Sequence, residues 1–470
     1  MELKGQKVLV LGLGESGLSM ATWLARRGAR VRVADSRGNP PGQDALRKAV
    51  PNVELHLGGW RDEDFTDADF IAISPGVPRE TPQVAKAVAA GKPVIGDVEL
   101  FARTLPAQNR PKIIAITGTN GKTTVTSLAG AMCRAAGLDC EVAGNISPAV
   151  LDALMAREDS QRNGGKPADA WVLELSSFQL ESTYSLGADA AAMLNLTEDH
   201  LDRHGSMRDY GAAKARIFEG RGAQVLNRDD AASLAMALPG RRVLTFGTDA
   251  PASDDEFGLV KDGGRLWLAQ GGSRLLATDE MQLAGLHNAA NALAALALCR
   301  AIGLPFEPLL GAVRAFRGLP HRVEFVAEVN GARYYDDSKG TNVGSTVAAL
   351  AGLSGTLPAG AKVVLIAGGE GKGQDFSPLA DVLARTARAV VLIGRDAPLI
   401  EKAIEKAAAG TGVTLLRAPS MQAAVDAAAA LARPGDAVLL SPACASFDMF
   451  RDYRHRGKVF TALVKERAHV

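Results

Sequence analysis

Short apolar runs separated by longer stretches of helical character recur along the whole chain, and this pattern starts afresh twice. The runs form three series, at 7–12, 31–35 and 69–74, at 111–117, 170–177 and 191–196, and at 363–369, 389–394 and 437–443. Alternation of strands and helices is typical of parallel sheets built from βαβ units. The pattern therefore predicts an α/β fold of three domains.

Two segments join one series to the next and mark the expected domain boundaries. They are GDVELF at 96–101 and RGLPHRVE at 317–324. Within the second series, residues 156–168 are polar, contain glycine and show no period, which predicts an exposed loop. The expected domains are 1–96, 97–318 and 319–470.

Composition and charge narrow the class of protein. A chain of 470 residues with 47% hydrophobic composition is long enough for two to four domains. The net charge is +1, and acidic and basic residues are mixed along the chain. This pattern does not predict a basic surface for binding a nucleic acid or an anionic membrane. No apolar run approaches the roughly 20 residues of a membrane span, and the start lacks a signal-peptide pattern. We therefore expect a soluble, cytoplasmic protein.

The four cysteines show no metal-binding or redox spacing. No CxxC pair occurs among them, and all lie in apolar or helical contexts, so reduced thiols are the expected state. They are Cys133, Cys140, Cys299 and Cys444.

A GxGxxG motif at 12–17 follows the first predicted strand, and Asp35 closes the next one. Glycines there let backbone N–H groups reach a pyrophosphate, and the acid can hold a ribose hydroxyl. One hypothesis is an NAD-dependent oxidoreductase; another is that the glycines serve only tight helix–strand packing. The same chemistry would hold any nucleotide diphosphate.

A phosphate-binding loop opens the second series, directly after the strand at 111–117. In GTNGKTT (118–124), backbone N–H groups can surround a phosphate, Lys122 can reach its outer oxygens and Thr123 can bind Mg²⁺. The loop departs from GxxxxGK[ST] because Ile116 occupies the first glycine position. Glu174, at the end of the next strand, is a candidate metal ligand, so strand, loop and acid together favour a nucleotide site over an ordinary glycine-rich turn.

Two further residues have a chemical and a plain structural interpretation. NLTEDHLD (195–202) ends another strand of this series, and His200 within it can ligate a divalent cation or simply satisfy the local structure. Lys214 lies in a helical stretch, where a solvated lysine is the default interpretation. Spacing alone does not decide either case.

Several motifs in this order give the chain a resemblance to the Mur ligase family of bacterial peptidoglycan synthesis. The resemblance spans essentially the whole chain and is most specific in DDSKGTNVGST (336–346), which indicates the members that add glutamate to UDP-N-acetylmuramoyl-L-alanine. The other motifs are GTNGKTT, GNISPAV (144–150), LELSSFQLE (173–181), NLTEDHLDRH (195–204), YGAAKARIF (210–218), GLHNAANALAA (285–295), GLPHRVE (318–324), GGEGKGQDFSPL (368–379) and SPACASFDMF (441–450).

The resemblance implies a Rossmann-like N-terminal domain, a central P-loop ATPase-type domain with a mixed sheet, and a Rossmann-like C-terminal domain in a monomer. Lys122, Glu174, His200 and Lys214 would be catalytic. ATP would be bound by Gly118, Thr119, Asn120, Gly121, Lys122, Thr123, Thr124, Asn288, Asn291, Arg322 and Asp337. Two Mg²⁺ ions, which Mn²⁺ can replace, would be held by Thr123, Glu174, His200 and an N-carbamylated Lys214.

The remaining residues would bind the two acceptor substrates, with no nucleic acid or membrane as partner. The UDP-linked substrate would contact Gly14, Glu15, Ser16, Asp35, Ser36, Arg37, Ser74, Gly76, Asn145 and Ser176, with His200 near the reacting carboxylate. The glutamate site and the ATP side of the C-terminal domain would be built by His321, Arg322, Asp337, Lys339, Thr341, Lys372, Ser446 and Phe447.

The implied reaction is amide formation through an acyl phosphate. The alanine carboxylate attacks the γ-phosphate, and the glutamate amine then displaces phosphate. Folylpolyglutamate synthase is a related ligase that would not need residues 1–96, and a non-catalytic nucleotide-binding protein would lack Lys122 or Glu174. D-Glutamate is the default, with L-glutamate as the alternative, because Glu370, Phe447 and Tyr453 depart from the commonest pattern.

Overall fold

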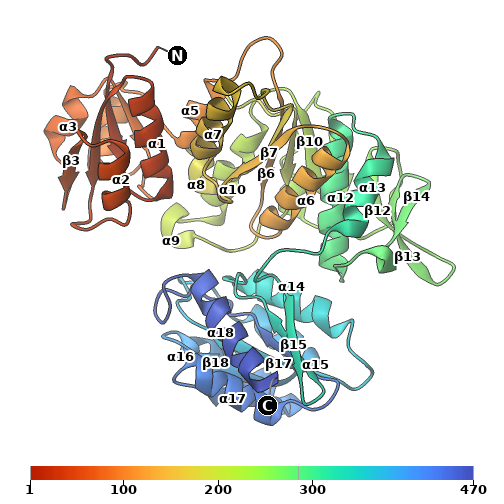
Figure 1. The fold of residues 1–470 in the computed structure, drawn as a ribbon. Helices are drawn as coiled ribbons and strands as arrows, with labels where there is room; N and C mark the ends of the chain where they lie inside the picture. Colours follow the sequence, from red (N-terminus) through yellow and green to blue (C-terminus); the bar gives the residue numbers. More distant parts are fainter. Residues whose placement is uncertain (1, 284, 469–470) are drawn as a thin grey trace.

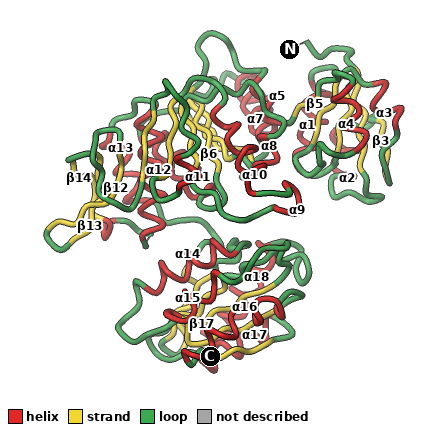
Figure 2. The backbone as a smooth tube through the Cα atoms, turned by 180° about the vertical axis from the view of Figure 1, so that it is seen from behind, coloured by secondary structure: helices red, strands yellow, loops and turns green. Residues whose placement is uncertain are grey.

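The computed structural model describes residues 2–283 and 285–468, and these form three sheets, each flanked by helices (Figure 1). The N-terminal sheet lies beside the central one, and the C-terminal sheet lies below the central one in Figure 1. Figure 2, from behind, shows the same arrangement. The predicted three-part α/β architecture is confirmed.

The N-terminal sheet has five parallel strands in the order β3-β2-β1-β4-β5. Its inner strands are continuous apolar runs because helices cover both faces. The strands are β1 (Lys7–Leu11), β2 (Arg30–Asp35), β3 (Glu54–Leu57), β4 (Phe70–Ile73) and β5 (Val94–Ile95); the helices are α1 (Glu15–Arg26), α2 (Gln43–Ala49), α3 (Asp62–Asp67) and α4 (Pro82–Ala89).

The central sheet has nine strands in the order β14-β13-β12-β11-β10-β9-β6-β8-β7. The strands β6 to β12 run parallel, while β13 runs antiparallel to both of its neighbours, β12 and β14, so the predicted mixed sheet is confirmed. The strands are β6 (Lys112–Thr117), β7 (Cys140–Gly144), β8 (Ala170–Glu174), β9 (Ala190–Met193), β10 (Ala223–Asn227), β11 (Val243–Phe246), β12 (Glu256–Asp262), β13 (Arg265–Gln270) and β14 (Ser273–Ala277).

The helices of the central part cover both faces of this sheet, with α6 and α12 packed against each other. They are α5 (Asp97–Ala102), α6 (Lys122–Ala135), α7 (Val150–Arg162), α8 (Ser177–Leu180), α9 (Leu201–His204), α10 (Met207–Ala215), α11 (Ala231–Leu234), α12 (Leu286–Ala301) and α13 (Phe306–Ala315).

The C-terminal sheet has six strands in the order β15-β16-β20-β17-β18-β19, all parallel except β15. The strands are β15 (Glu324–Val329), β16 (Ala332–Asp336), β17 (Val363–Gly368), β18 (Ala387–Ile393), β19 (Thr414–Arg417) and β20 (Ala437–Leu440); the helices are α14 (Val343–Ser354), α15 (Pro378–Thr386), α16 (Ala397–Thr411), α17 (Met421–Leu431) and α18 (Tyr453–Ala468).

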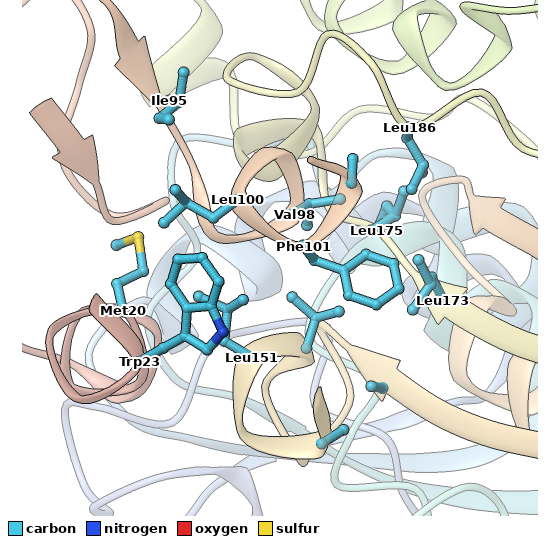
Figure 3. Close-up of a cluster of buried hydrophobic side chains, with 14 of the residues drawn as sticks. Met20, Trp23, Ile95, Val98, Leu100, Phe101, Leu151, Leu173, Leu175 and Leu186 are labelled. Atoms are coloured by element: carbon cyan, nitrogen blue, oxygen red, sulfur yellow. The ribbon is translucent and has the colours of Figure 1, made fainter. Parts of the chain in front are cut away.

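One apolar cluster joins the first two sheets (Figure 3). Met20 and Trp23 of α1 pack there with Leu100 of α5 and Leu151 of α7, and the same cluster continues to Leu173 of β8. No apolar cluster among the described residues combines side chains of the central and C-terminal sheets. Burial of apolar surface therefore holds the N-terminal and central parts together, whereas the described residues of the C-terminal part share no apolar cluster with the central part.

The predicted loop at 156–168 is wrong over its first half, because α7 continues to Arg162. The polar side chains of this helix are paired rather than free. Asp159 accepts from Arg26, the last residue of α1, and Glu158 from Arg27, which follows it, while Arg157 pairs with Asp139. A polar helix face that meets another domain lacks the apolar period on which the sequence prediction depended.

All nine predicted strands are strands in the structure, although some end a few residues early. The four cysteines are unpaired and buried, as expected. Within residues 2–283 and 285–468, none of the helices has the length and apolar character that a bilayer-spanning helix needs.

Candidate functional site

The loop between β6 and α6 has the backbone of a phosphate-binding loop. Gly121, which precedes the helix, has φ of 83°, and a Cβ atom there would lie 2.6 Å from Oδ1 of Asn291. The position therefore requires glycine. Lys122 Nζ donates to the carbonyl oxygens of Gly118 and Thr119 at 2.7 and 2.8 Å, so the ammonium is held inside the loop.

Glu174 lies beside this loop because β6 and β8 are neighbouring parallel strands that end at the same edge. Its carboxylate is buried. Oε1 accepts a hydrogen bond from Asn145 Nδ2 at 2.7 Å, whereas Oε2 is buried without a partner among the residues that the structure describes. Burial of a carboxylate oxygen without a hydrogen-bond partner costs free energy of folding unless a cation binds to it. With the hydroxyl of Thr123 nearby in the same cavity, this arrangement fits the predicted Mg²⁺ site.

His200 follows β9, the other neighbour of β6, and adopts left-handed φ of 54°. Burial lowers the pKa of its imidazole to about 4, so the ring is neutral at pH 7 and keeps a lone pair for a cation or a hydrogen bond. Its Nε2 lies 3.6 Å from Oδ2 of Asp199. The structure thus brings His200 to the same edge as the phosphate loop.

Lys214 is fully buried, so the default interpretation of a solvated lysine is wrong. Its Nζ donates to the Gly118 carbonyl at 2.8 Å and to Thr117 Oγ1 at 3.3 Å, and it lies 4.8 Å from the ring centre of Tyr210. Burial, reinforced by the nearby Lys122 ammonium, holds the pKa of this amine well below its usual value. The tertiary packing of α10 against the phosphate loop placed it there.

A cavity of about 630 Å³ opens between the central and C-terminal parts, and it contains most of the predicted site. Figure 1 shows the two parts facing each other across this region. The predicted residues that line the cavity are Thr119, Asn120, Gly121, Lys122, Thr123, Thr124, Asn145, Glu174, Ser176, His200, Lys214, Asn288, Asn291, Arg322, Asp337, Lys339, Thr341 and Lys372.

Polar contacts cross this cavity from the C-terminal part. Arg322 Nη2 donates to Thr123 Oγ1 at 2.5 Å, and Lys372 Nζ pairs with Asp199 Oδ1 at 3.0 Å. Asn342 Nδ2 donates to Asn120 Oδ1 at 3.1 Å. Residues predicted to bind ATP and residues predicted to bind glutamate therefore lie in one site.

The C-terminal wall carries two buried ionisable groups with shifted pKa values. Burial raises the pKa of the Asp337 carboxyl to about 7 and lowers that of the Lys339 ammonium to about 8. Lys339 Nζ also lies 4.3 Å from the ring centre of Tyr453. Such shifts are frequent at functional sites.

Three predicted residues of the C-terminal part do not line the cavity. His321 is turned to Asp336, with Nδ1 2.6 Å from Oδ2. Ser446 is buried, and Phe447 is 71% exposed. Their assignment to the glutamate site stays a prediction.

The predicted UDP residues of the N-terminal sheet form a separate group outside the cavity lining. Asp35 Oδ2 accepts from the Leu13 N–H at 2.7 Å and pairs with Arg37, while Ser74 Oγ donates to the Gly12 carbonyl. A Cβ atom at Gly17 would lie 1.8 Å from that carbonyl oxygen, so this glycine serves helix–strand packing. The other predicted members are Gly14, Glu15, Ser16, Ser36 and Gly76.

Several cavity residues were missed by sequence reasoning. The signal for Asp199 was its place beside His200 in NLTEDH, and that for Tyr210 was its place in YGAAKARIF. Asn195, Thr197, His287 and Asn342 also lie within quoted motifs, whereas the other missed residues lie in none. The missed residues include Asn195, Thr197, Asp199, Tyr210, Asn227, Asp229, Phe246, Thr248, His287 and Asn342.

Three family models together match most of the chain. Residues 6–96 match the Mur ligase MurD-like N-terminal domain, 116–299 the Mur ligase middle domain, and 321–444 the Mur ligase glutamate ligase domain. A UDP-N-acetylmuramoylalanine–D-glutamate ligase of Nitrosospira multiformis is 57% identical over 469 residues, which cover 99% of this chain and 96% of that protein. The chain belongs to the Mur ligase family. A ligase of the same name from Aromatoleum aromaticum is 56% identical, with 98% of each chain covered.

Solved structures share the fold of this Mur ligase at low identity. MurF of Acinetobacter baumannii has a TM-score of 0.62 at 17% identity, covering 100% of this chain and 92% of that one. MurC of Thermotoga maritima has 0.61 at 19%, covering 98% and 99%. E. coli FolC in complex with ADP has 0.57 at 18%, covering 79% of this chain and 94% of that one.

Proposed function

We propose that this Mur ligase joins D-glutamate to UDP-N-acetylmuramoyl-L-alanine in peptidoglycan precursor synthesis, with cleavage of ATP to ADP and phosphate. The observation that carries the proposal is the likeness, at 57% identity over 99% of the chain, to a ligase of that name. The phosphate loop and the basic residues of the C-terminal part meet in one cavity, which is the arrangement that such a reaction needs.

The three parts divide the work among the substrates. Residues 1–96 bind the UDP moiety, 97–318 bind ATP and its metal ions, and 319–470 bind glutamate. One chain supplies every group that the reaction requires, so we propose that it acts as a monomer. ATP and a UDP-linked precursor are cytoplasmic substrates, which places the reaction in the cytoplasm.

The residues of the cavity can promote amide formation by positioning and charge. Lys122 and Arg322 bring positive charge to the transferring phosphoryl group, which the alanine carboxylate attacks to give an acyl phosphate. Lys339 and Lys372 hold glutamate carboxylates on the facing wall. Holding the reactants in line can supply on the order of 7–11 kcal/mol of the barrier, and enclosure keeps water from the acyl phosphate.

The donor set also fits a divalent cation of the Mg²⁺ type. Oε2 of Glu174 has no partner in the described part of the chain, Thr123 offers a hydroxyl and His200 a neutral imidazole. When bound, Mg²⁺ neutralises phosphate charge. Mn²⁺, with similar ligand preferences, can replace it.

Lys214 is proposed to react with CO₂ to give a carbamate. Only the neutral amine attacks CO₂, and burial, which lowers the pKa of Lys214, increases the share of that form. The new N–C bond forms and one proton leaves the nitrogen for solvent, so that an uncharged buried amine beside Lys122 becomes an anion. The carbamate oxygens would support a second Mg²⁺.

The hand of the amino acid is tested with each pure enantiomer. We expect phosphate release that requires ATP, UDP-N-acetylmuramoyl-L-alanine and D-glutamate together, because a changed stereocentre moves the amine off its line of attack and about 1 Å of misplacement can cost a hundredfold in rate. Phosphate release with L-glutamate alone would assign the protein to the L-specific variant and give weight to Glu370, Phe447 and Tyr453. Omission of each substrate in turn is the control.

The N-terminal part is expected to bind UDP and not NAD. Although burial alone would raise the pKa of Asp35, hydrogen bonds from Arg37 and the Leu13 N–H lower it and occupy both carboxylate oxygens. The match of residues 6–96 to the Mur ligase MurD-like N-terminal domain supports UDP over NAD as the nucleotide held here. Calorimetry on the full chain, with UDP and NADH in competition, checks this, and a preference for NADH would overturn the assignment.

A further inference from the structure

Three loops of the C-terminal part carry the residues proposed to bind glutamate. The loop at 337–342 joins β16 to α14 and carries Lys339 and Thr341. The loop at 369–377 joins β17 to α15 and carries Lys372, and the loop at 441–452 joins β20 to α18. All three leave the carboxyl ends of parallel strands, so they gather at one edge of the sheet.

Gln374 is hydrogen-bonded to the backbone at all three loops. Its Oε1 accepts from the N–H of Val343, the first residue of α14, at 2.8 Å. Its Nε2 donates to the carbonyl of Gly371 in its own loop and to that of Ala443 in the third loop, both at 2.9 Å. One side chain thus connects all three segments of the proposed site.

The three partners require an amide in one orientation. An amide offers one acceptor oxygen and a nitrogen with two donors, and the partners are one N–H and two carbonyl groups. The reversed orientation would set donor against donor and acceptor against acceptors. Gln374 is therefore matched to its surroundings in a way that neither a carboxylate nor an apolar side chain can reproduce.

The loops that it joins have backbone conformations that need support. Lys372 and Ala443 have φ of 54° and 57°, a region that is unfavourable for residues with a Cβ atom. Gln374 bonds to the carbonyl just before Lys372 and to that of Ala443 itself. These bonds hold both residues in their unfavourable conformations.

We infer that Gln374 is a positioning residue for the amino-acid substrate, because its amide sets the relative placement of the three loops that bind glutamate. The inference rests on the proposed function, through which those loops are assigned to glutamate. Asn342, which caps α14, separately donates to Asn120 of the phosphate loop, so this contact with the nucleotide side does not involve Gln374. By placing the three loops, Gln374 aligns the amine of glutamate with the carbonyl that it attacks.

The test compares Gln374→Ala and Gln374→Glu with Gln422→Ala, a control on the exposed surface of α17. We expect Gln374→Ala to raise the KM for glutamate by about tenfold to a hundredfold. Gln374→Glu should raise the KM for glutamate further, because a carboxylate oxygen would replace the amide nitrogen and face the carbonyl oxygens of Gly371 and Ala443. The KM for ATP should stay close to that of the unmodified protein, as should all values for the control.

Two other results would reject the positioning role of Gln374, and a third would reject the proposed function. An unchanged KM for glutamate in both Gln374 variants removes the positioning role. A parallel loss of ATP binding, turnover and thermal stability in both variants shows a general structural role, and also removes it. If the unmodified protein releases no phosphate with the three substrates, the proposed function fails instead.

Discussion

Replacement of Lys122 by alanine is expected to reduce substrate-dependent phosphate release by about a hundredfold to a thousandfold or more. The ammonium is held in the phosphate loop by the carbonyls of Gly118 and Thr119, and burial lowers its pKa although Glu174 and Asp199 oppose this. Phosphate oxygens would stabilise the charged form. Alanine removes that charge and leaves the backbone of the loop intact.

The unfolding midpoint is the measurement that separates chemistry from stability for Lys122. Within residues 2–283 and 285–468, the hydrogen bonds of this side chain go to carbonyls of its own loop, so we expect the midpoint of Lys122→Ala to match that of the unmodified protein. Lys166→Ala, at an exposed position of the central part, is the matched control. Near-normal turnover in Lys122→Ala would refute the assignment of this loop to ATP.

Replacement of Lys214 by alanine is expected to lower turnover by about a hundredfold, because the carbamate proposed to support a metal ion is lost. Short carboxylic acids such as formate or acetate should then restore part of the turnover. They can enter the space left by the side chain and supply the missing anionic oxygens. Phosphate release at increasing acid concentration measures this rescue.

Two controls isolate the carbamate from other effects. The same acids should not restore Lys122→Ala, which lacks a cation rather than an anion. In protein equilibrated with ¹³C-labelled CO₂, a carbamate carbonyl resonance should be present by NMR and absent from Lys214→Ala. If the resonance is identical in both, or if Lys214→Ala keeps normal turnover without acids, Lys214 is not carbamylated in the active protein.

Buried parallel strands were the most predictable part of this fold. Runs such as 111–117 and 437–443 are continuously apolar because helices cover both faces of each sheet, and this leaves a clear signal. The same reasoning placed Glu174 and His200 beside the phosphate loop, since neighbouring parallel strands end at one edge. The carboxyl edge of the central sheet could thus be assembled from sequence alone.

Elements whose polar face meets another part of the chain were less predictable. The sequence predicts a loop over the second half of α7, because its charged residues pair with Arg26 and Arg27 at the C-terminal end of α1 and leave no apolar period. The strands β12–β14 were not predicted, because polar and partly exposed positions interrupt their apolar residues. β13 pairs with its sequence neighbours β12 and β14, whereas the partner of α7 is distant in sequence, and local periodicity does not record it.

The contacts across the cavity could not be predicted for the same reason. Nothing local indicates that Arg322 reaches Thr123 or that Lys372 pairs with Asp199. Likewise, the burial of Lys214 depends on how α10 packs against the phosphate loop. The resemblance supplied Arg322, Thr123, Lys372 and Lys214 but not Asp199, and the tertiary structure gave them their charge environment.

The apolar cluster shared by α1, α5 and α7 determines where the polypeptide can be divided into autonomous folding units. A cut after Gly96 separates Trp23 and Met20 from Leu100 and Leu151 and leaves their apolar surfaces facing water, which favours aggregation of both fragments. A cut near Gly318 breaks polar contacts and opens no shared core. Cooperative unfolding should therefore follow two units rather than three, with the first two sheets melting together.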